Sequence, residues 1–379
     1  MTSQQTLTQN PLSQLASCGQ SYWLDNLTRS MIQTGELQRR VTEEGLRGMT
    51  SNPTTFHAAI TGGRDYDEQI GQLSRTGVTT TELFEALMVT DVQNACDILR
   101  PVYESTERLD GYVSLEVSPH FAHDAYRTMD HVRRLHSLVN RPNVMIKIPG
   151  TSAGIPAIEE MLYEGLNINI TLLFSIQSYQ GVAEAFLRAL ERRLGENRPI
   201  DGIASVASFF VSRVDTLIDQ LLAHRIYGDD KSAMPAQLLG RAAVANARVA
   251  YKYFKQIFAG DRWAKLVKRG ARVQRVLWAS TGRKNPAYSD VGYIEPLVGR
   301  DTVNTMPEAT IKAFVDHGRV VADSVEADVE DALDVLRELE NVGIDYRCAT
   351  WQLENEGVQK FIDSYDTCLQ AIEKKRKSG

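Results

Sequence analysis

The sequence repeats one pattern eight times: a short run typical of a buried strand, followed by a stretch with helical periodicity. Several of these runs are apolar at both odd and even positions, as expected for parallel strands that are covered on both faces. The alternation predicts an α/β fold, a (β/α)8 TIM barrel. An open doubly wound sheet is the alternative, but no GxGxxG follows the first run and no GxxxxGK[ST] occurs. The runs cover residues 21–27, 48–54, 111–117, 143–149, 166–174, 205–211, 275–280 and 301–307.

The 379 residues exceed the roughly 250 that a minimal barrel of this type needs. The surplus falls at the N-terminus and in helical stretches, so we expect extra helices around the barrel. These helical stretches are 55–107, 212–270 and 308–373. No shift in composition marks a second domain. We therefore expect a flexible segment over 1–20, one barrel domain over 21–373, and a solvated basic tail over 374–379.

Composition and charge exclude several functional classes. The net charge of -6 gives no general attraction to nucleic acid. No apolar run reaches the roughly 18–20 residues that span a membrane, and the polar N-terminus does not resemble a secretory signal. The four cysteines are scattered without a CxxC pair, and no HExxH occurs. We expect a cytoplasmic protein that needs no metal or other cofactor and that binds neither nucleic acid nor membrane.

Lys147 stands in the middle of an apolar strand-like run, NVMIKIP. It shares its parity with Met145, while Val144, Ile146 and Ile148 face the other way. In a barrel this parity directs Lys147 toward the interior near the mouth. Burying an ammonium group is costly, so the lysine is either paired, kept neutral for chemistry, or extended so that its charge reaches solvent.

Polar residues gather where the predicted strands end, which is where barrel enzymes build their active sites. A neutral amine from Lys147 is a nucleophile for a carbonyl carbon and gives an imine. Asp25 and Glu116 would supply proton transfers. Paired carboxylates also serve glycoside hydrolysis, but that reaction does not require the lysine. The polar residues at strand ends are Asp25, Thr50, Asn52, Glu116, Lys147, Asn169, Thr171, Ser208, Ser280, Asn304 and Thr305.

Cations follow the late strands. Arg213 comes just after the sixth strand, and the segment STGRK, with Ser280, Arg283 and Lys284, follows the seventh. Loops at these positions often bind phosphate in barrels, and arginine or lysine with hydroxyl groups suits that ligand. The alternative is ordinary solvated loop charge. A ketose phosphate, with its ketone and its phosphate, would satisfy the whole set.

These segments resemble the transaldolase family over roughly residues 20–372. The resemblance is carried by seven motifs in the family's order: MTSNPTTF (49–56), SLEVSP (114–119), MIKIPGT (145–151), NINITLLF (167–174), ASFFVSR (207–213), WASTGRKNP (278–286) and DTVNTMP (301–307). It implies a class I aldolase-type barrel that moves a dihydroxyacetone unit between sugar phosphates through a lysine Schiff base.

The resemblance also implies roles for individual residues. Lys147 would form the imine, and Asp25 would act as acid and base at the donor's C4 hydroxyl. Glu116, with Thr171 and a water molecule, would be the second proton-transfer group. Where some members read Ser-Phe-Arg-Asn after the seventh strand, this chain reads STGRKN; the longer branch of the family favours Lys284 over Arg283 as the second phosphate cation. The residues implied to bind substrate are Asn52, Thr50, Asn169, Ser208, Phe210, Arg213, Ser280 and Lys284.

Three functions stay open on this basis: transfer, simple cleavage and binding alone. A related barrel group cleaves fructose 6-phosphate without transfer, and there water must hydrolyse the intermediate. Phe210 offers no hydroxyl to activate that water and Glu116 is a carboxylate, so transfer is favoured. A non-catalytic sugar-phosphate-binding protein would have no use for Lys147. The expected partners are small sugar phosphates, and the protein is expected to be a monomer or a homodimer.

Overall fold

The computed structural model describes residues 10–226 and 234–378, and its centre is a closed barrel of eight parallel strands. The strands follow one another around the barrel in chain order, and β8 closes against β1. This confirms the predicted (β/α)8 fold. The strands are β1 (Gln20–Asp25), β2 (Gly48–Thr50), β3 (Tyr112–Glu116), β4 (Val144–Pro149), β5 (Ile168–Leu173), β6 (Ser205–Phe210), β7 (Arg275–Ala279) and β8 (Thr302–Met306).

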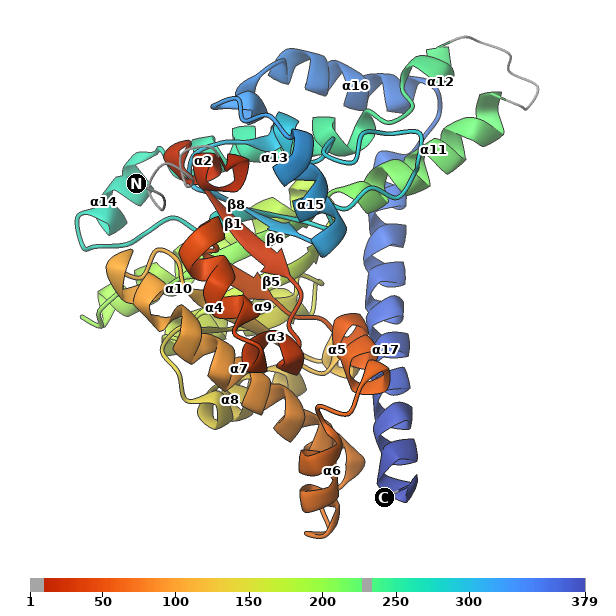
Figure 1. Ribbon diagram of the computed structural model, residues 1–379. Coiled ribbons are helices and arrows are strands. Elements are labelled where there is room, and N and C mark those ends of the chain that lie inside the picture. The colour runs from red at the N-terminus through yellow and green to blue at the C-terminus, as the bar shows by residue number, and fades with distance from the viewer. Residues whose placement is uncertain (1–9, 227–233, 379) are drawn as a thin grey trace, which may run out of the picture.

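Helices surround the barrel and add a second layer at one end and along one side (Figure 1). Ser118 and Pro119 together are typical of a helix start, which predicts a helix over 118–140, but the structure differs at this start. Asp124 caps the helix there, whereas the Ser118 N–H donates to His131. The helices are α2 (Pro11–Ser17), α3 (Arg29–Gln33), α4 (Glu36–Arg39), α5 (Pro53–Gly62), α6 (Asp67–Ser74), α7 (Thr80–Ser105), α8 (Ala125–Val139), α9 (Gly154–Glu164), α10 (Ile176–Gly195), α11 (Ser212–Ile226), α12 (Met234–Gln237), α13 (Ala242–Ile257), α14 (Asp261–Val267), α15 (Glu308–His317), α16 (Val329–Asn341) and α17 (Tyr346–Ser378).

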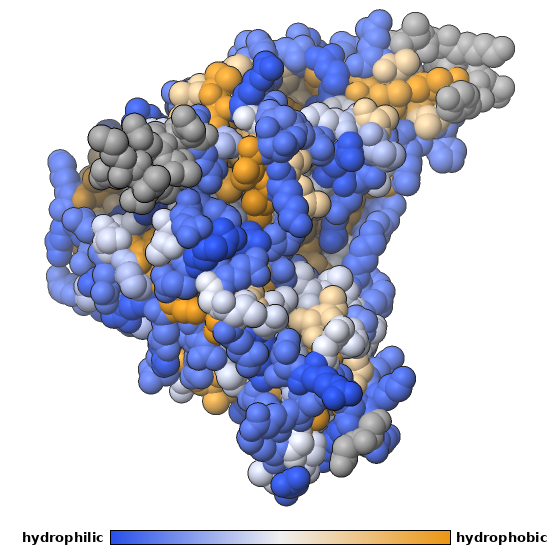
Figure 2. Space-filling view, viewed as in Figure 1, coloured by the Kyte–Doolittle hydropathy of each residue, from blue (hydrophilic) through white to orange (hydrophobic). Residues whose placement is uncertain are grey.

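The strands are buried on both faces because side chains fill the barrel and helices cover its outside. One close approach depends on a glycine. Gly48 of β2 pairs with Trp23 of β1, and a Cβ on Gly48 would lie 2.4 Å from the Trp23 ring. The short second strand therefore packs beside a large buried indole. The outer surface is mostly hydrophilic on the face shown in Figure 2.

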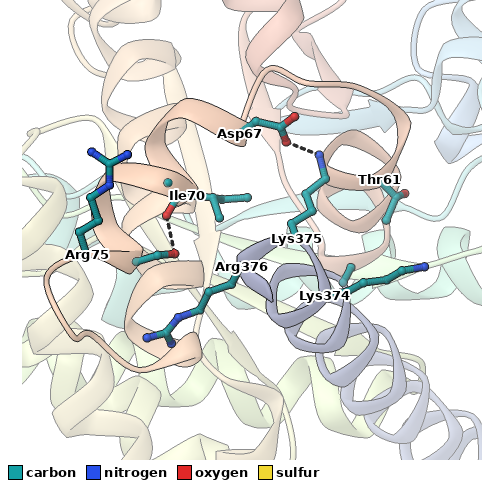
Figure 3. Close-up of a pocket in the computed structure, with 10 residues that line it drawn as sticks. Thr61, Asp67, Ile70, Arg75, Lys374, Lys375 and Arg376 are labelled. Carbon is teal, nitrogen blue, oxygen red and sulfur yellow. Dashed lines mark hydrogen bonds and ion pairs between the residues drawn. The ribbon is translucent and has the colours of Figure 1, made fainter. Parts of the chain in front are cut away.

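Both predicted terminal segments differ from the structure. The first nine residues lie outside the described part, but α2 buries Leu12 and Leu15, and β1 begins at Gln20. At the other end, α17 continues to Ser378 instead of stopping before a tail. Lys375 donates to an Asp67 carboxylate oxygen of α6 at 2.5 Å, an ion pair that Figure 3 shows across a surface pocket. The basic end of the chain is therefore docked helix.

The long helix α17 runs along one side of the molecule, past α5 to α6 (Figure 1). It contacts β5 as well as α5 and α7, so it links the barrel to the insertion after β2. Within residues 10–226 and 234–378, no helix combines the length and apolar character that crossing a membrane requires.

Candidate active site

A cavity of about 370 Å³ opens at the end of the barrel where the strands finish. All the residues predicted to act in catalysis or substrate binding line it except Glu116 and Asn169, although they come from six strands or the loops that follow them. Parallel strands in a barrel end at the same rim, which brings distant residues together. The predicted residues that line the cavity are Asp25, Thr50, Asn52, Lys147, Thr171, Ser208, Phe210, Arg213, Ser280 and Lys284.

Lys147 is paired inside the barrel. Its ammonium group contacts a Glu116 carboxylate oxygen on the neighbouring strand and donates to the Ser51 carbonyl oxygen at 3.1 Å. The Lys147 and Glu116 side chains are only 7% and 9% exposed. The alternative in which the charged end of the lysine reaches solvent is therefore wrong. Strand pairing of Glu116 with Lys147 sets this contact directly.

Burial raises the pKa of Glu116 above its ordinary value, although the Lys147 ammonium group acts in the opposite direction. A carboxyl group with a raised pKa is a better proton acceptor than an ordinary one. Proton exchange between Lys147 and Glu116 inside the pair would leave a neutral amine beside a neutral acid. Such a pair can supply both the nucleophile and the proton that carbonyl addition requires.

The described side chains that donate to Asp25 both bond to the same carboxylate oxygen. Its Oδ1 atom accepts from Thr50 Oγ1 at 2.9 Å and from Asn52 Nδ2 at 3.3 Å. Asn52 also caps α5, because its side-chain oxygen accepts from the Thr55 N–H. Thr50 in turn contacts Thr305 Oγ1 of β8 at 2.8 Å. The carboxylate is thus fixed in orientation at the cavity wall.

Asn169 lies beneath the cavity, and its side chain is fully engaged with neighbours. It donates to Ser114 Oγ at 2.9 Å and accepts from Ser208 Oγ at 2.7 Å. Ser208 itself lines the cavity. In this structure Asn169 orients Ser208, which stands between the amide and the cavity.

Thr171 sits at an irregular part of β5. The pairing of β5 with β6 shifts between Ile170 and Leu173, and Leu172 has a φ of +62°. A bulge of this kind redirects side chains and is common next to active sites. The Thr171 hydroxyl lines the cavity and has no hydrogen-bond partner among the described residues. It is free to bond to a ligand or to a water molecule.

Arg213 and Lys284 create a positive end in the cavity. Neither forms an ion pair with a carboxylate in the part of the chain that the structure describes, and Arg213 Nη1 is buried without a partner. Burial lowers the pKa of Arg213, and burial together with the Arg213 charge lowers that of Lys284. Ser280 lines the same cavity in a left-handed conformation, with a φ of +56°, and its hydroxyl lies 3.0 Å from that of Ser212. Two cations without a counterion beside a hydroxyl suit a phosphate group.

The residues singled out in the sequence did not include two groups that contact or approach the Lys147 nitrogen. Phe361 of α17 lines the cavity, and its ring centroid lies 6.0 Å from Lys147 Nζ. The Ser51 carbonyl accepts from the same ammonium group. Phe361 belongs to an amphipathic helix that is far along the sequence from every strand end. A backbone carbonyl group has no sequence pattern. Thr305, predicted as a polar residue at a strand end, also lines the cavity, whereas Asn304 beside it donates to the Tyr293 carbonyl oxygen at 3.4 Å.

The chain is similar to known proteins over nearly its whole length. A family model described as Transaldolase/Fructose-6-phosphate aldolase matches residues 22–372. Transaldolase 2 of Nostoc punctiforme is 48% identical over 374 residues, and Transaldolase 2 of Nostoc sp. is 46% identical over 374; each alignment covers 97% of this chain and 98% of the relative. Transaldolase 1 of Streptomyces avermitilis is 46% identical over 361 residues, with 95% and 94% covered. These matches make the chain an enzyme of the transferase class. It belongs to the transaldolase/fructose-6-phosphate aldolase family.

Proposed function

We propose that the protein transfers a dihydroxyacetone unit from a ketose phosphate to an aldose phosphate through a Schiff base on Lys147. The donor would be sedoheptulose 7-phosphate or fructose 6-phosphate. The acceptor would be glyceraldehyde 3-phosphate or erythrose 4-phosphate, in the cytoplasmic, non-oxidative part of the pentose phosphate pathway. The observation that carries the proposal is the buried Lys147–Glu116 pair at the rim of a barrel cavity that also holds Arg213 and Lys284, neither of which has an ion-pair partner among the described residues.

The first step is attack of the Lys147 amine on the donor ketone. Transfer of a proton from Lys147 to Glu116 generates the neutral amine. Addition gives a carbinolamine, and loss of its hydroxyl group as water gives the iminium ion. Glu116, with its raised pKa, would return the proton that the leaving hydroxyl group needs. The Thr171 hydroxyl, which has no other partner among the described residues, would hold the water molecule that relays this proton.

Cleavage of the carbon–carbon bond requires a base at the C4 hydroxyl of the donor. Asp25 suits this role because both of its described side-chain donors, Thr50 and Asn52, bond to Oδ1. Its second oxygen can accept the hydroxyl proton while the iminium takes up the electron pair. The product aldehyde leaves, and the enamine stays on Lys147 until an acceptor aldehyde binds. Asp25 then returns the proton to the new hydroxyl group. Water adds to the iminium carbon of the product, the carbon–nitrogen bond breaks, and the new ketose phosphate leaves with the Lys147 amine restored.

The phosphate of donor or acceptor would lie between Arg213 and Lys284, with a hydrogen bond from Ser280. Charge-assisted bonds of this type are strong and fix the distance from the phosphate to the reacting carbon. Asn52 and Ser208 would hold substrate hydroxyl groups near Lys147.

Cleavage without transfer is the second candidate activity, because the family includes fructose-6-phosphate aldolases. Phe210 lines the cavity with an apolar ring, which stacks 5.4 Å from the Arg213 guanidinium carbon. It gives no hydroxyl group with which to activate water against the enamine. This favours transfer over hydrolysis. A protein that only binds sugar phosphates would not need the pairing of Lys147 with Glu116.

Borohydride trapping tests the proposal. The protein is incubated with fructose 6-phosphate, reduced with borohydride, digested, and its peptides are analysed by mass spectrometry. We expect a dihydroxyacetone-derived adduct on the peptide that contains Lys147, and none in Lys147→Met. Lys284→Met should still be trapped at high substrate concentration, because it retains the amine at residue 147. An unmodified Lys147 peptide in the unsubstituted protein would refute the Schiff-base mechanism.

A further inference from the structure

The cavity contains an apolar group directly over its nucleophile. Most of the lining carries hydroxyl, amide or charged groups, which hold water as readily as sugar. Phe361 is an exception, and its ring centroid lies 6.0 Å from Lys147 Nζ. Phe210, the other aromatic ring in the lining, packs instead against Arg213 and Phe174. Of the two aromatic rings in the lining, Phe361 is thus the one that lies beside the lysine nitrogen.

The chain fixes Phe361 in this position from both sides. Four residues before it, Gly357 lies so close to β5 that an added Cβ would be 2.9 Å from Leu172 Cδ2. Four residues after it, Tyr365 packs edge-to-face on Phe84 of α7, with ring centroids 5.2 Å apart. Phe361 itself is only 9% exposed. The ring is therefore a packed part of the cavity wall.

The same helix is tied to the insertion that carries Asn52. Ser364 Oγ contacts Thr54 Oγ1 at 3.0 Å, and the Cys368 thiol donates to the Pro53 carbonyl at 3.1 Å. Further along, Lys375 pairs with Asp67, as Figure 3 shows. These contacts hold α17 against α5, so the helix that carries Phe361 cannot move away from the cavity without breaking them.

We propose that Phe361 is a specificity-determining residue that keeps water from protonating the enamine held on Lys147 and so favours transfer over release of free dihydroxyacetone. The proposal rests on the Schiff-base function above. The loss reaction that it suppresses begins when a water molecule donates a proton to the enamine carbon, which leaves an iminium ion and a hydroxide ion. Water oxygen then bonds to the iminium carbon and loses a proton, the carbon–nitrogen bond breaks, and free dihydroxyacetone leaves with the amine restored. The product ketose of a transfer leaves through the same hydrolysis, so protonation of the enamine carbon is the step that separates loss from transfer. An apolar ring beside the nitrogen withholds the water that would donate this proton.

The test compares Phe361→Ala with the unsubstituted enzyme. Two rates are measured with fructose 6-phosphate as donor: transfer to erythrose 4-phosphate, and release of free dihydroxyacetone without acceptor. We expect the ratio of release to transfer to rise about tenfold or more, because the smaller side chain admits water that can protonate the enamine carbon. Trp351→Ala, on the same helix but 68% exposed at that residue, is the matched control and should leave the ratio unchanged.

A structural effect alone would lower both rates together. An unchanged ratio in Phe361→Ala would therefore overturn the proposal. If that variant does not fold, Phe361→Val decides, with a rise of about threefold or more expected from the room it leaves for a water molecule, and an unchanged ratio again overturning the proposal. Borohydride trapping of Lys147 in each variant separates the two hypotheses: failure to trap the unsubstituted protein refutes the Schiff base, whereas trapping with an unchanged ratio refutes only the role of Phe361.

Discussion

Adjacent basic residues after β7 have different surroundings. Lys284 lines the cavity near Arg213, whose charge helps to lower the pKa of the lysine. The Arg283 guanidinium turns to its own loop and donates to the carbonyl oxygens of Pro286 and Tyr288, at 3.4 and 3.1 Å. A side chain already engaged with its loop is poorly placed to bind phosphate. The structure therefore favours Lys284 as the second phosphate cation.

We expect Lys284→Met to raise the KM for a phosphorylated acceptor by about 10- to 100-fold, the size of one charge-assisted hydrogen bond. Arg283→Met is the matched control and should change KM less than threefold, by the smaller value of a neutral or exposed contact. Steady-state kinetics with glyceraldehyde 3-phosphate and with unphosphorylated glyceraldehyde would measure both effects. The loss in Lys284→Met should disappear with the unphosphorylated acceptor. Equal effects of the two variants would contradict this assignment.

At the scale of elements, α11 holds the loop that bears Ser280 and Lys284. Asp215, on the helix that begins beside Arg213, accepts from the Tyr293 hydroxyl at 2.8 Å and from a backbone N–H of α13 at 2.7 Å. The helix that carries Arg213 and the segment after β7 that carries Lys284 are thereby joined through the buried Asp215 carboxyl group. Burial raises the pKa of Asp215 to about 6 from an ordinary value of 3.8.

Because its pKa is raised, Asp215 makes the stability of the protein depend on pH in a defined direction. The folded state binds the Asp215 proton more tightly than the unfolded state does. Its contribution to stability is therefore complete below about pH 4 and is lost as the pH rises through about 6. The shift corresponds to a free energy on the order of 3 kcal/mol.

Asp215→Asn is neutral at every pH and still offers an oxygen to the α13 N–H. We expect its melting temperature, relative to the unsubstituted protein, to increase between pH 4.5 and 7.5. Thermal unfolding monitored by circular dichroism across this range measures the difference. The exposed Glu330→Gln is a control for general charge effects. A difference that stays constant with pH would show that Asp215 does not titrate in this way.

Over the whole molecule, the barrel places a buried ion pair at each end. At the rim, Lys147 lines the cavity and is paired with Glu116 on the neighbouring strand. At the opposite end, Arg275 donates to Asp110 at 2.9 Å and to Ser21 Oγ at 2.6 Å. That second pair joins the starts of β7 and β1 to the segment before β3. In barrels of this type, chemistry belongs to the carboxyl ends of strands, and the other end contributes stability.

Asp110→Asn should therefore lower stability without changing the chemistry. Breaking a buried pair leaves the Arg275 charge uncompensated and costs about 3–5 kcal/mol. Urea unfolding should show this loss, while kcat and KM measured under conditions where the variant is fully folded stay near their original values. Lys147→Met should give the opposite result, with transfer abolished in a folded protein. A large fall in kcat for fully folded Asp110→Asn would contradict the division of roles.

Much of the fold could be read from local patterns. Each of the eight strands lies within or overlaps its expected run, because doubly buried parallel strands require continuous apolar segments. The cap of α10 at Ser175 and the end of α9 at Gly165 also follow local rules. The start of α8 does not follow a local rule, because the Ser118 N–H donates to His131, a contact that depends on tertiary packing. The helical end of the chain could not be predicted for the same reason, because Lys375 is paired with Asp67 on α6.

The sequence by itself determined the barrel and placed Asp25, Glu116 and Lys147 at one rim, because strand order and side-chain parity are local properties. Only the tertiary structure decided that Lys147 is paired with Glu116, that Asn169 lies beneath Ser208, and that Phe361 covers the nucleophile. These contacts join residues from different elements, and their geometry depends on how helices and strands pack. The position of α17 over the cavity is the clearest case: the pattern of an amphipathic helix specifies a buried face, but not the surface against which that face packs.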